Sequence, residues 1–298
     1  MTDSRALVPT ADFSDRVLAV LAAGALGAGA GSDATGPGES ETLALFIMDG
    51  LLEAIEWANE GVASDETACM WLAGLRWYKA VTGAFPLSAP EPLTRWIDDE
   101  LGALGPIGSP ADPRSRSGLD SAQMSSTGRR VFPDADGPGV LPRAAAIALL
   151  PRVDAETTSR LASGAAALTH GTDAAHGAAS LAALMVRSGI EADMAAVTRW
   201  TSMLDGSGQH GPAMAALRRA VAVASAALSA GGPSGTRLPA ALNASIAAGA
   251  GPDEASFTAA LIASVLGTQA LPAGWEASLS IAPLVTGMHA RWLAATGS

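Results

Sequence analysis

The sequence predicts an all-α fold built as a single compact helical domain, and three observations lead to that prediction. Alanine is abundant, whereas aromatic residues make up only 4% of the 298 residues. Alanine is the best helix former and is depleted in strands. Apolar residues recur every four positions at Leu43, Ile47, Leu51 and Ile55, which is the spacing of a buried helix face. No stretch of the sequence resembles a pair of strands, so helices are expected to form the whole core.

Successive helices are separated by short polar, glycine-rich or proline-containing stretches. Glycines within 24–31 are expected to end the first helix, and Gly61 the second. Gly, Pro, Ser and Asp dominate 105–142, which indicates an irregular insertion in the domain that spans 1–298. Residues 231–237 are expected to form a linker loop. The expected helices cover 15–25, 40–59, 65–82, 93–104, 155–168, 174–186, 191–204, 212–230, 258–267 and 284–295.

Composition excludes several classes of function. The net charge of −11 disfavours nucleic acid as a partner, since affinity for phosphate backbones comes largely from Lys and Arg. Lys79 is the only lysine, and no Gly-Lys-Ser/Thr phosphate loop surrounds it. A lone cysteine, Cys69, allows no intrachain disulfide and fits a cytoplasmic location. The apolar run at 17–31 is too short and too glycine-rich to span a membrane, and no basic segment precedes it.

A polar tetrad opens the most apolar helix of the chain. It consists of Glu39, Ser40, Glu41 and Thr42 and runs straight into an apolar stretch at 43–48. Ser40 is predicted to be the N-cap, because its hydroxyl can accept a hydrogen bond from a free backbone N–H. The dipole of a helix favours acidic residues in its first turn. A capped helix explains these residues fully, so any functional role needs support from other parts of the chain.

That support comes from a resemblance in order and spacing to the ADP-ribosylglycohydrolase family, which includes dinitrogenase-reductase-activating glycohydrolases. A glycine turn with Gly137 and Gly139 precedes Arg143, where the family has a Gly-rich turn and a Met-Arg pair. His170 lies in a Thr-His-Gly element before an alanine-rich helix. A second acidic cluster, at 253–257, is followed by Gly267, Leu271-Pro272 and Trp275. The resemblance implies the family's all-α fold over residues 16 to about 279.

The resemblance also implies a magnesium site that this sequence has altered. Family members hold a pair of magnesium ions with Thr-Asp-Asp-Thr and Gly-Gly-Asp-x-Asp-Thr motifs and with an Asp at the position of Ala28. Here Ser40, Ser256 and Phe257 replace further ligands, and magnesium is usually anchored by carboxylates. We therefore expect no metal site and no cofactor, with magnesium relevant only in an active enzyme.

Three functions remain open. The small number of acidic residues in the two clusters favours a degenerate homologue, which binds ADP-ribose, a related nucleotide or an ADP-ribosylated protein without efficient turnover. The second is a divergent hydrolase in which Glu41 and Glu254 are the catalytic pair on a glycosidic bond to ADP-ribose. The third is a scaffold that binds a protein partner and no small ligand. The residues expected to line a ligand site are Glu39, Ser40, Thr42, Gly137, Gly139, Arg143, His170, Asp253 and Ser256.

Overall fold

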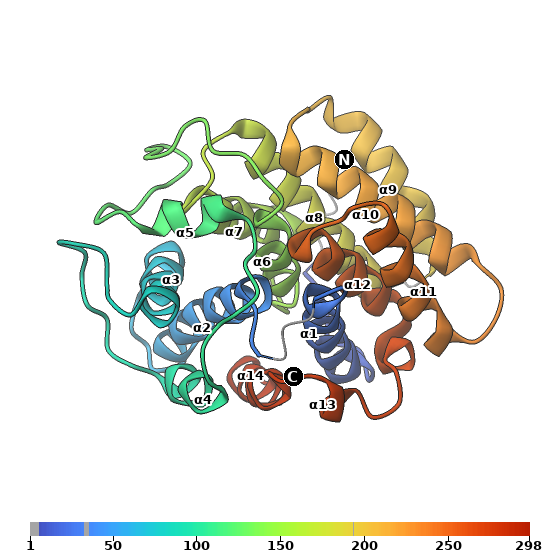
Figure 1. Ribbon diagram of the computed structural model, residues 1–298, viewed down its shortest axis with the longest axis horizontal. Coiled ribbons are helices and arrows are strands. Elements are labelled where there is room, and N and C mark those ends of the chain that lie inside the picture. The colour runs from blue at the N-terminus through green and yellow to red at the C-terminus, as the bar shows by residue number, and fades with distance from the viewer. Residues whose placement is uncertain (1–5, 33–35, 193) are drawn as a thin grey trace.

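Helices form the regular structure of the described residues in the computed structural model (Figure 1). The structure describes residues 6–32, 36–192 and 194–298. Within these ranges the only β-type pairing is an isolated bridge between Gly38 and Ser109, so the predicted all-α class is confirmed. The helices are α1 (Phe13–Gly29), α2 (Glu39–Asn59), α3 (Glu66–Thr82), α4 (Trp96–Leu104), α5 (Pro113–Leu119), α6 (Val140–Ile147), α7 (Ala155–Ala167), α8 (Asp173–Ala192), α9 (Met194–Ser207), α10 (Pro212–Ser229), α11 (Ser234–Ala247), α12 (Pro252–Leu266), the 3-10 helix η1 (Gly267–Ala270), α13 (Trp275–Ser278) and α14 (Ala282–Thr296).

Helices α6 and α12 lie at the centre of the molecule (Figure 1). Every residue of α6 is buried, including Arg143, and α12 is buried from Asp253 to Val265. Helix α1 packs along α12, α2 packs on α3, and α8 packs on both α6 and α7. A helix that is apolar on all sides belongs in the interior of a protein, and α12 and α6 take that position. Arg143 of α6 and the acidic first turn of α12 are therefore enclosed by the fold.

Small residues set the distance between α1 and α12. A Cβ atom added to Gly27 would lie 2.4 Å from the carbonyl oxygen of Ala255, so only glycine allows the two backbones to approach this closely. The first helix was expected to end within the glycine-rich stretch 24–31, near residue 25. Helix α1 does end in this stretch, at Gly29, four residues later than expected. Glycine serves close helix packing here, and a local pattern cannot distinguish that use from a turn.

A second difference concerns the expected linker at 231–237. Helix α11 begins at Ser234 and contains Pro239, so four residues of the expected linker are helical. Burial of Leu238, Ala241 and Ser245 against the rest of the fold compensates for the hydrogen bond that Pro239 cannot make. The segment 105–142 contains the short helix α5 and the first residues of α6 and is otherwise irregular.

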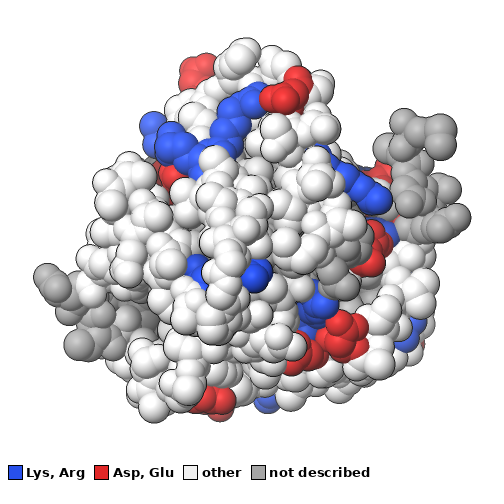
Figure 2. All heavy atoms as spheres, turned by 90° about the vertical axis from the view of Figure 1, so that its right-hand side faces the viewer, with Lys and Arg blue, Asp and Glu red and all other residues white. Residues whose placement is uncertain are grey.

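Charged residues are distributed unevenly over the surface. The sequence contains no Asp or Glu between 206 and 252, a stretch that covers α10 and α11. Figure 2 shows this side of the molecule, and few charged side chains appear across its middle. Among the described residues, no helix combines the length and hydropathy that a bilayer crossing requires.

The contact between α1 and α12 leads to a test with an internal control. We expect Gly27→Ala to lower the free energy of unfolding by about 1–3 kcal/mol, the usual cost of overpacking. Gly29→Ala lies in the same helix, where an added Cβ meets nothing within 4 Å. That variant should be neutral or up to about 1 kcal/mol more stable, since alanine is the better helix former. Urea denaturation of both variants measures the difference, and equal effects would contradict the packing argument.

Candidate functional site

The N-terminal end of α2 is closed by an acidic side chain. The backbone N–H of Gly38 donates to Glu41 Oε1 at 2.6 Å, and Gly38 is the N-cap residue of the helix. Ser40 therefore lies inside the first turn, and its predicted role as N-cap was wrong. The Thr42 hydroxyl donates to the Gly38 carbonyl and accepts from Trp77 Nε1 at 2.9 Å. Thr42 thus stabilises the junction of α2 with α3.

Two buried carboxylates, those of Glu41 and Asp253, influence each other across the helix ends. Burial raises the pKa of Glu41 to about 7, with a further contribution from the charge of Asp253 and partial opposition from the Gly38 N–H. Burial likewise raises the pKa of Asp253 to about 6. Asp253 Oδ2 accepts the backbone N–H of Asp112 at 2.8 Å. A carboxyl group with a pKa near neutrality can act as a general acid or base.

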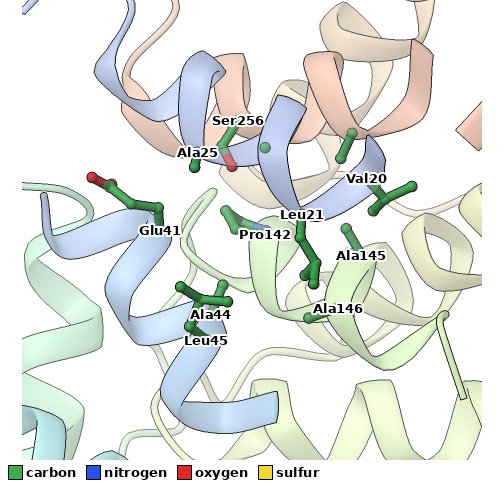
Figure 3. A pocket seen from close by; sticks show the side chains of 12 residues that line it. Val20, Leu21, Ala25, Glu41, Ala44, Leu45, Pro142, Ala145, Ala146 and Ser256 are labelled. Carbon is green, nitrogen blue, oxygen red and sulfur yellow. The ribbon is translucent and has the colours of Figure 1, made fainter. Parts of the chain in front are cut away.

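Ser40 and Ser256 lie close to these carboxylates. Ser40 Oγ is buried and has no hydrogen-bond partner of acceptable geometry among the described residues. Its hydroxyl is nevertheless close enough to Asp253 to oppose the rise in that pKa. Ser256 lines a small cavity together with Glu41 and apolar residues of α1, α2 and α6, and Figure 3 shows its hydroxyl directed inward. The cavity measures about 30 Å³, enough for a water molecule but not for a nucleotide.

Asp112 is the residue that joins the parts of the site, and the sequence reasoning missed it. Its carboxylate accepts the N–H groups of Arg114 and Gly139, each at 3.1 Å, and lies 3.0 Å from His170 Nε2. Burial opposes ionisation, but these hydrogen bonds hold the pKa of Asp112 well below its usual value. A signal was present in the sequence, because Asp followed by Pro113 is typical of a helix start, and Asp112 is indeed the N-cap of α5.

His170 is a buried link between Asp112 and Arg143. Burial lowers the pKa of His170, and its Nδ1 faces two donors, the Thr169 hydroxyl at 2.7 Å and Arg143 Nη2 at 3.4 Å. These partners assign the neutral tautomer, in which Nε2–H donates to Asp112. His170 thus connects the N-cap residue of α5 with Arg143 of α6.

Arg143 is a fully buried cation. It donates to the carbonyl oxygens of Gly139 and Ala165, both at 3.0 Å, and to Thr169 Oγ1 at 2.9 Å. Burial lowers its pKa to about 10, with opposition from the charges of Asp253 and Asp112, so the guanidinium stays charged at neutral pH. Glycine is required at both turn positions before Arg143. A Cβ on Gly137 would lie 2.0 Å from Asp112 Oδ2, and a Cβ on Gly139 would lie 2.5 Å from Ser115 Oγ.

The two remaining acidic residues are paired with arginines nearer the surface. Arg219 Nε donates to Glu254 Oε1 at 3.0 Å, and Arg219 Nη2 binds the other carboxylate oxygen. Glu39 forms an ion pair with Arg116 and also accepts the Ala111 N–H at 3.3 Å. Glu41 interacts with Asp253, and no contact joins Glu41 to Glu254 within the described ranges. The catalytic roles of Glu41 and Glu254 stay predictions.

A larger recess lies beside Glu39. We call it the Glu39 recess; its volume is about 310 Å³, within the range of small-ligand sites. The Tyr78 hydroxyl donates to Asp120 Oδ1 at 2.7 Å on its rim, and the half-exposed Arg116 contributes a guanidinium. The recess is lined by Glu39, Tyr78, Pro110, Ala111, Pro113, Arg116, Ser117 and Asp120.

The donor set does not fit the pair of magnesium ions that the fold family implies. Nowhere in the described part of the chain do three or more His, Cys, Asp or Glu side chains gather in a group able to hold a metal ion. The carboxylates of Asp112, Asp253, Glu39 and Glu254 already accept hydrogen bonds from protein donors. Magnesium needs free hard oxygen ligands in near-octahedral geometry, which these engaged carboxylates do not provide.

The raised pKa of Glu41 predicts that the free energy of unfolding depends on pH. A carboxyl group whose pKa rises from 4.5 to about 7 on folding binds its proton more tightly in the folded state. Its stabilising contribution is complete below pH 4.5 and is lost as the pH rises to 7. We expect the loss to reach at most about 3 kcal/mol, since a tenfold change in proton affinity is worth about 1.4 kcal/mol.

The measurement is the free energy of unfolding of wild type and Glu41→Gln between pH 4 and 8. The variant should show a smaller decline than the wild type, because glutamine cannot ionise and only the contribution of Asp253, whose pKa burial raises to about 6, remains in this window. Glu91→Gln, an exposed loop position, serves as the control and should keep the decline. Parallel curves for wild type and Glu41→Gln would contradict the raised pKa.

Asp112 gives a second prediction. Asp112→Ala leaves His170 and the backbone N–H groups of Arg114 and Gly139 without their shared acceptor. It also removes a negative charge that interacts with the buried Arg143, so the free energy of unfolding should fall by about 3–5 kcal/mol. Asp134→Ala removes an exposed carboxylate from the same segment and should change stability by less than about 0.5 kcal/mol. Thermal and urea denaturation of both variants provide the measurement, and a small effect at Asp112 would refute its central role.

Comparisons with known proteins agree with this architecture. No protein-family model matches the sequence, and neither does any curated protein. Solved structures do match, among them one described as an ADP-ribosylglycohydrolase-related protein complex, with 19% sequence identity and a TM-score of 0.57. The alignment covers 97% of this chain and 99% of that chain. Identity this low shows the fold and not the activity. The chain therefore has an ADP-ribosylglycohydrolase-like fold, as the order and spacing of its motifs predicted.

Proposed function

We propose that this protein is a catalytically impaired ADP-ribosylglycohydrolase-like protein that binds ADP-ribose or a related nucleotide without magnesium. The observation that supports this proposal is the engagement of the acidic residues by protein donors. Asp112 is held by His170 Nε2 at 3.0 Å, Asp253 by the Asp112 N–H at 2.8 Å, and Glu254 by Arg219. These hydrogen bonds occupy the oxygens that a dinuclear metal site would need.

The Glu39 recess is the proposed place for the nucleotide. Its volume of about 310 Å³ suits part of a dinucleotide-sized ligand, with the remainder in solvent. Arg116 offers guanidinium donors to a diphosphate, the kind of contact in which arginine is strong. Tyr78 offers a ring for stacking against a base, and Glu39 offers carboxylate oxygens to a ribose diol. Binding of the diphosphate would compete with the Arg116–Glu39 ion pair.

A divergent hydrolase is the second candidate. The pKa of Glu41, raised by burial to about 7, suits a general acid, and a cavity of about 30 Å³ beside it can hold one water molecule. Glu254 would be the second carboxylate, and it would first have to leave Arg219. A scaffold that binds only a protein partner is the third possibility.

Calorimetric titration with ADP-ribose, in magnesium and in a chelator, tests the proposal. We expect equal affinity in both conditions, a loss of binding in Arg116→Ala, and no change in Arg129→Ala, an exposed arginine of the same segment. The wild type should release no ADP-ribose from a modified protein.

Two other outcomes would replace the proposal. Magnesium-dependent binding, with ADP-ribose release that Glu41→Gln abolishes, would establish the hydrolase. Absence of binding in both conditions would favour the protein-binding scaffold.

A further inference from the structure

A second pocket lies between α3 and α4, under the loop that connects them at the left edge of Figure 1. Its volume is about 300 Å³, again within the range of small-ligand sites. Leu101 and Ile107 give it an apolar wall, and Phe85 gives it an aromatic one. Lys79 comes from α3, whereas Asp98 and Asp99 come from α4. We call it the Phe85 pocket.

The Phe85 pocket already contains one cation, which belongs to the protein itself. Lys79 Nζ lies 4.8 Å from the centroid of the Phe85 ring, the geometry of a cation–π contact. Lys79 is an exposed residue on a flexible side chain and has no ion pair within the described residues. The Lys79 ammonium can therefore move from the ring into solvent with only a small loss of free energy.

The surroundings of the ring favour positive charge. Asp98 is bound by the buried Arg76, whereas Asp99 is exposed and has no ion pair in the described part of the chain. The last turns of α3 and α4 both border the pocket, through Lys79 and Ala80 on one helix and Leu101 and Gly102 on the other. The C-terminal end of a helix carries partial negative charge. An aromatic face, a free carboxylate and two helix C-termini thus converge on one space.

We propose that the Phe85 pocket binds a small organic cation, an alkylammonium or alkylguanidinium, over the ring of Phe85. The charged head of the ligand takes the position of the Lys79 ammonium and pairs with Asp99. Its alkyl chain packs on Leu101 and Ile107. Lys79 competes with the ligand for the ring, so its ammonium must leave the ring before the head of the ligand can take that position. This site is separate from the Glu39 recess and does not depend on the proposed nucleotide binding.

The single lysine makes the displacement directly observable. Reductive methylation with a ¹³C label marks Lys79 and the amino terminus and preserves the positive charge. In the free protein, the Lys79 methyl signal should be shifted upfield by the ring current of Phe85. Titration with butylammonium or butylguanidinium should return it to the position of a solvated lysine, whereas butanol and butyrate should leave it in place.

Variants separate the roles of the pocket residues in calorimetry with butylammonium. Lys79→Met removes the competitor and should tighten binding about two- to fivefold, the factor that an exposed cation–π contact carries. Asp99→Asn and Phe85→Leu should each weaken it by about threefold or more. Glu100→Gln, an exposed neighbour on α4 outside the pocket, should change nothing, and Arg116→Ala should also leave binding intact.

Three results would overturn the proposal. One is a Lys79 signal that does not respond to either cation. Another is an equal response to butanol or butyrate. The last is weaker binding in Lys79→Met, since that would make the lysine a ligand-binding group in place of a competitor. Circular dichroism of each variant confirms that the fold is retained, which is expected because Lys79 and Asp99 are exposed.

Discussion

The hydrogen bonds of Asp112 are the constraint on which the arrangement of the polar site depends. The carboxylate receives His170 Nε2 at 3.0 Å and the Gly139 N–H at 3.1 Å, and the backbone N–H of the same residue binds Asp253 at 2.8 Å. These contacts join the segment before α5, the turn before α6, the loop between α7 and α8 and the first turn of α12. An unsatisfied charge in such a place would be costly, so each partner fixes the others.

This network determines what the acidic residues can do. Asp112 is kept ionised by its donors, whereas burial favours the protonated forms of Glu41 and Asp253. Arg143 supplies one buried positive charge close to them. Near neutral pH the protein thus offsets part of this negative charge with its own groups, through Arg143 and through partial protonation of Glu41. Carboxylates whose charge is offset by protein groups attract a divalent cation less strongly. This is a physical reason why the residues present do not fit a site for two magnesium ions.

The sequence predicted those features that depend on local pattern. Helix α2 was predicted from its apolar periodicity and its acidic first turn. Helix α12 was expected at 258–267 from the family resemblance, but it begins six residues earlier, at Pro252, so the acidic residues at 253 and 254 lie in its first turn. The N-terminal residues of both helices are buried. Asp112 was missed because its partners, His170 and Asp253, are 58 and 141 residues away, and no local pattern reports such pairings. The cap of α2 was misassigned for a related reason, since the glutamate side chain at Glu41 reached back to Gly38 and displaced Ser40 from that role.

The same reasoning explains why the two large pockets differ in character. The Glu39 recess adjoins the network, so its charged groups are already paired, as Arg116 with Glu39 shows. A ligand there must exchange one ion pair for another, which favours a strong anion such as a diphosphate. The Phe85 pocket lies outside the network, and its cation, Lys79, rests on a ring and forms no ion pair within the described residues. A contact held by one weak interaction is easily exchanged, so a cationic ligand needs to displace less at the Phe85 pocket than an anion does at the Glu39 recess.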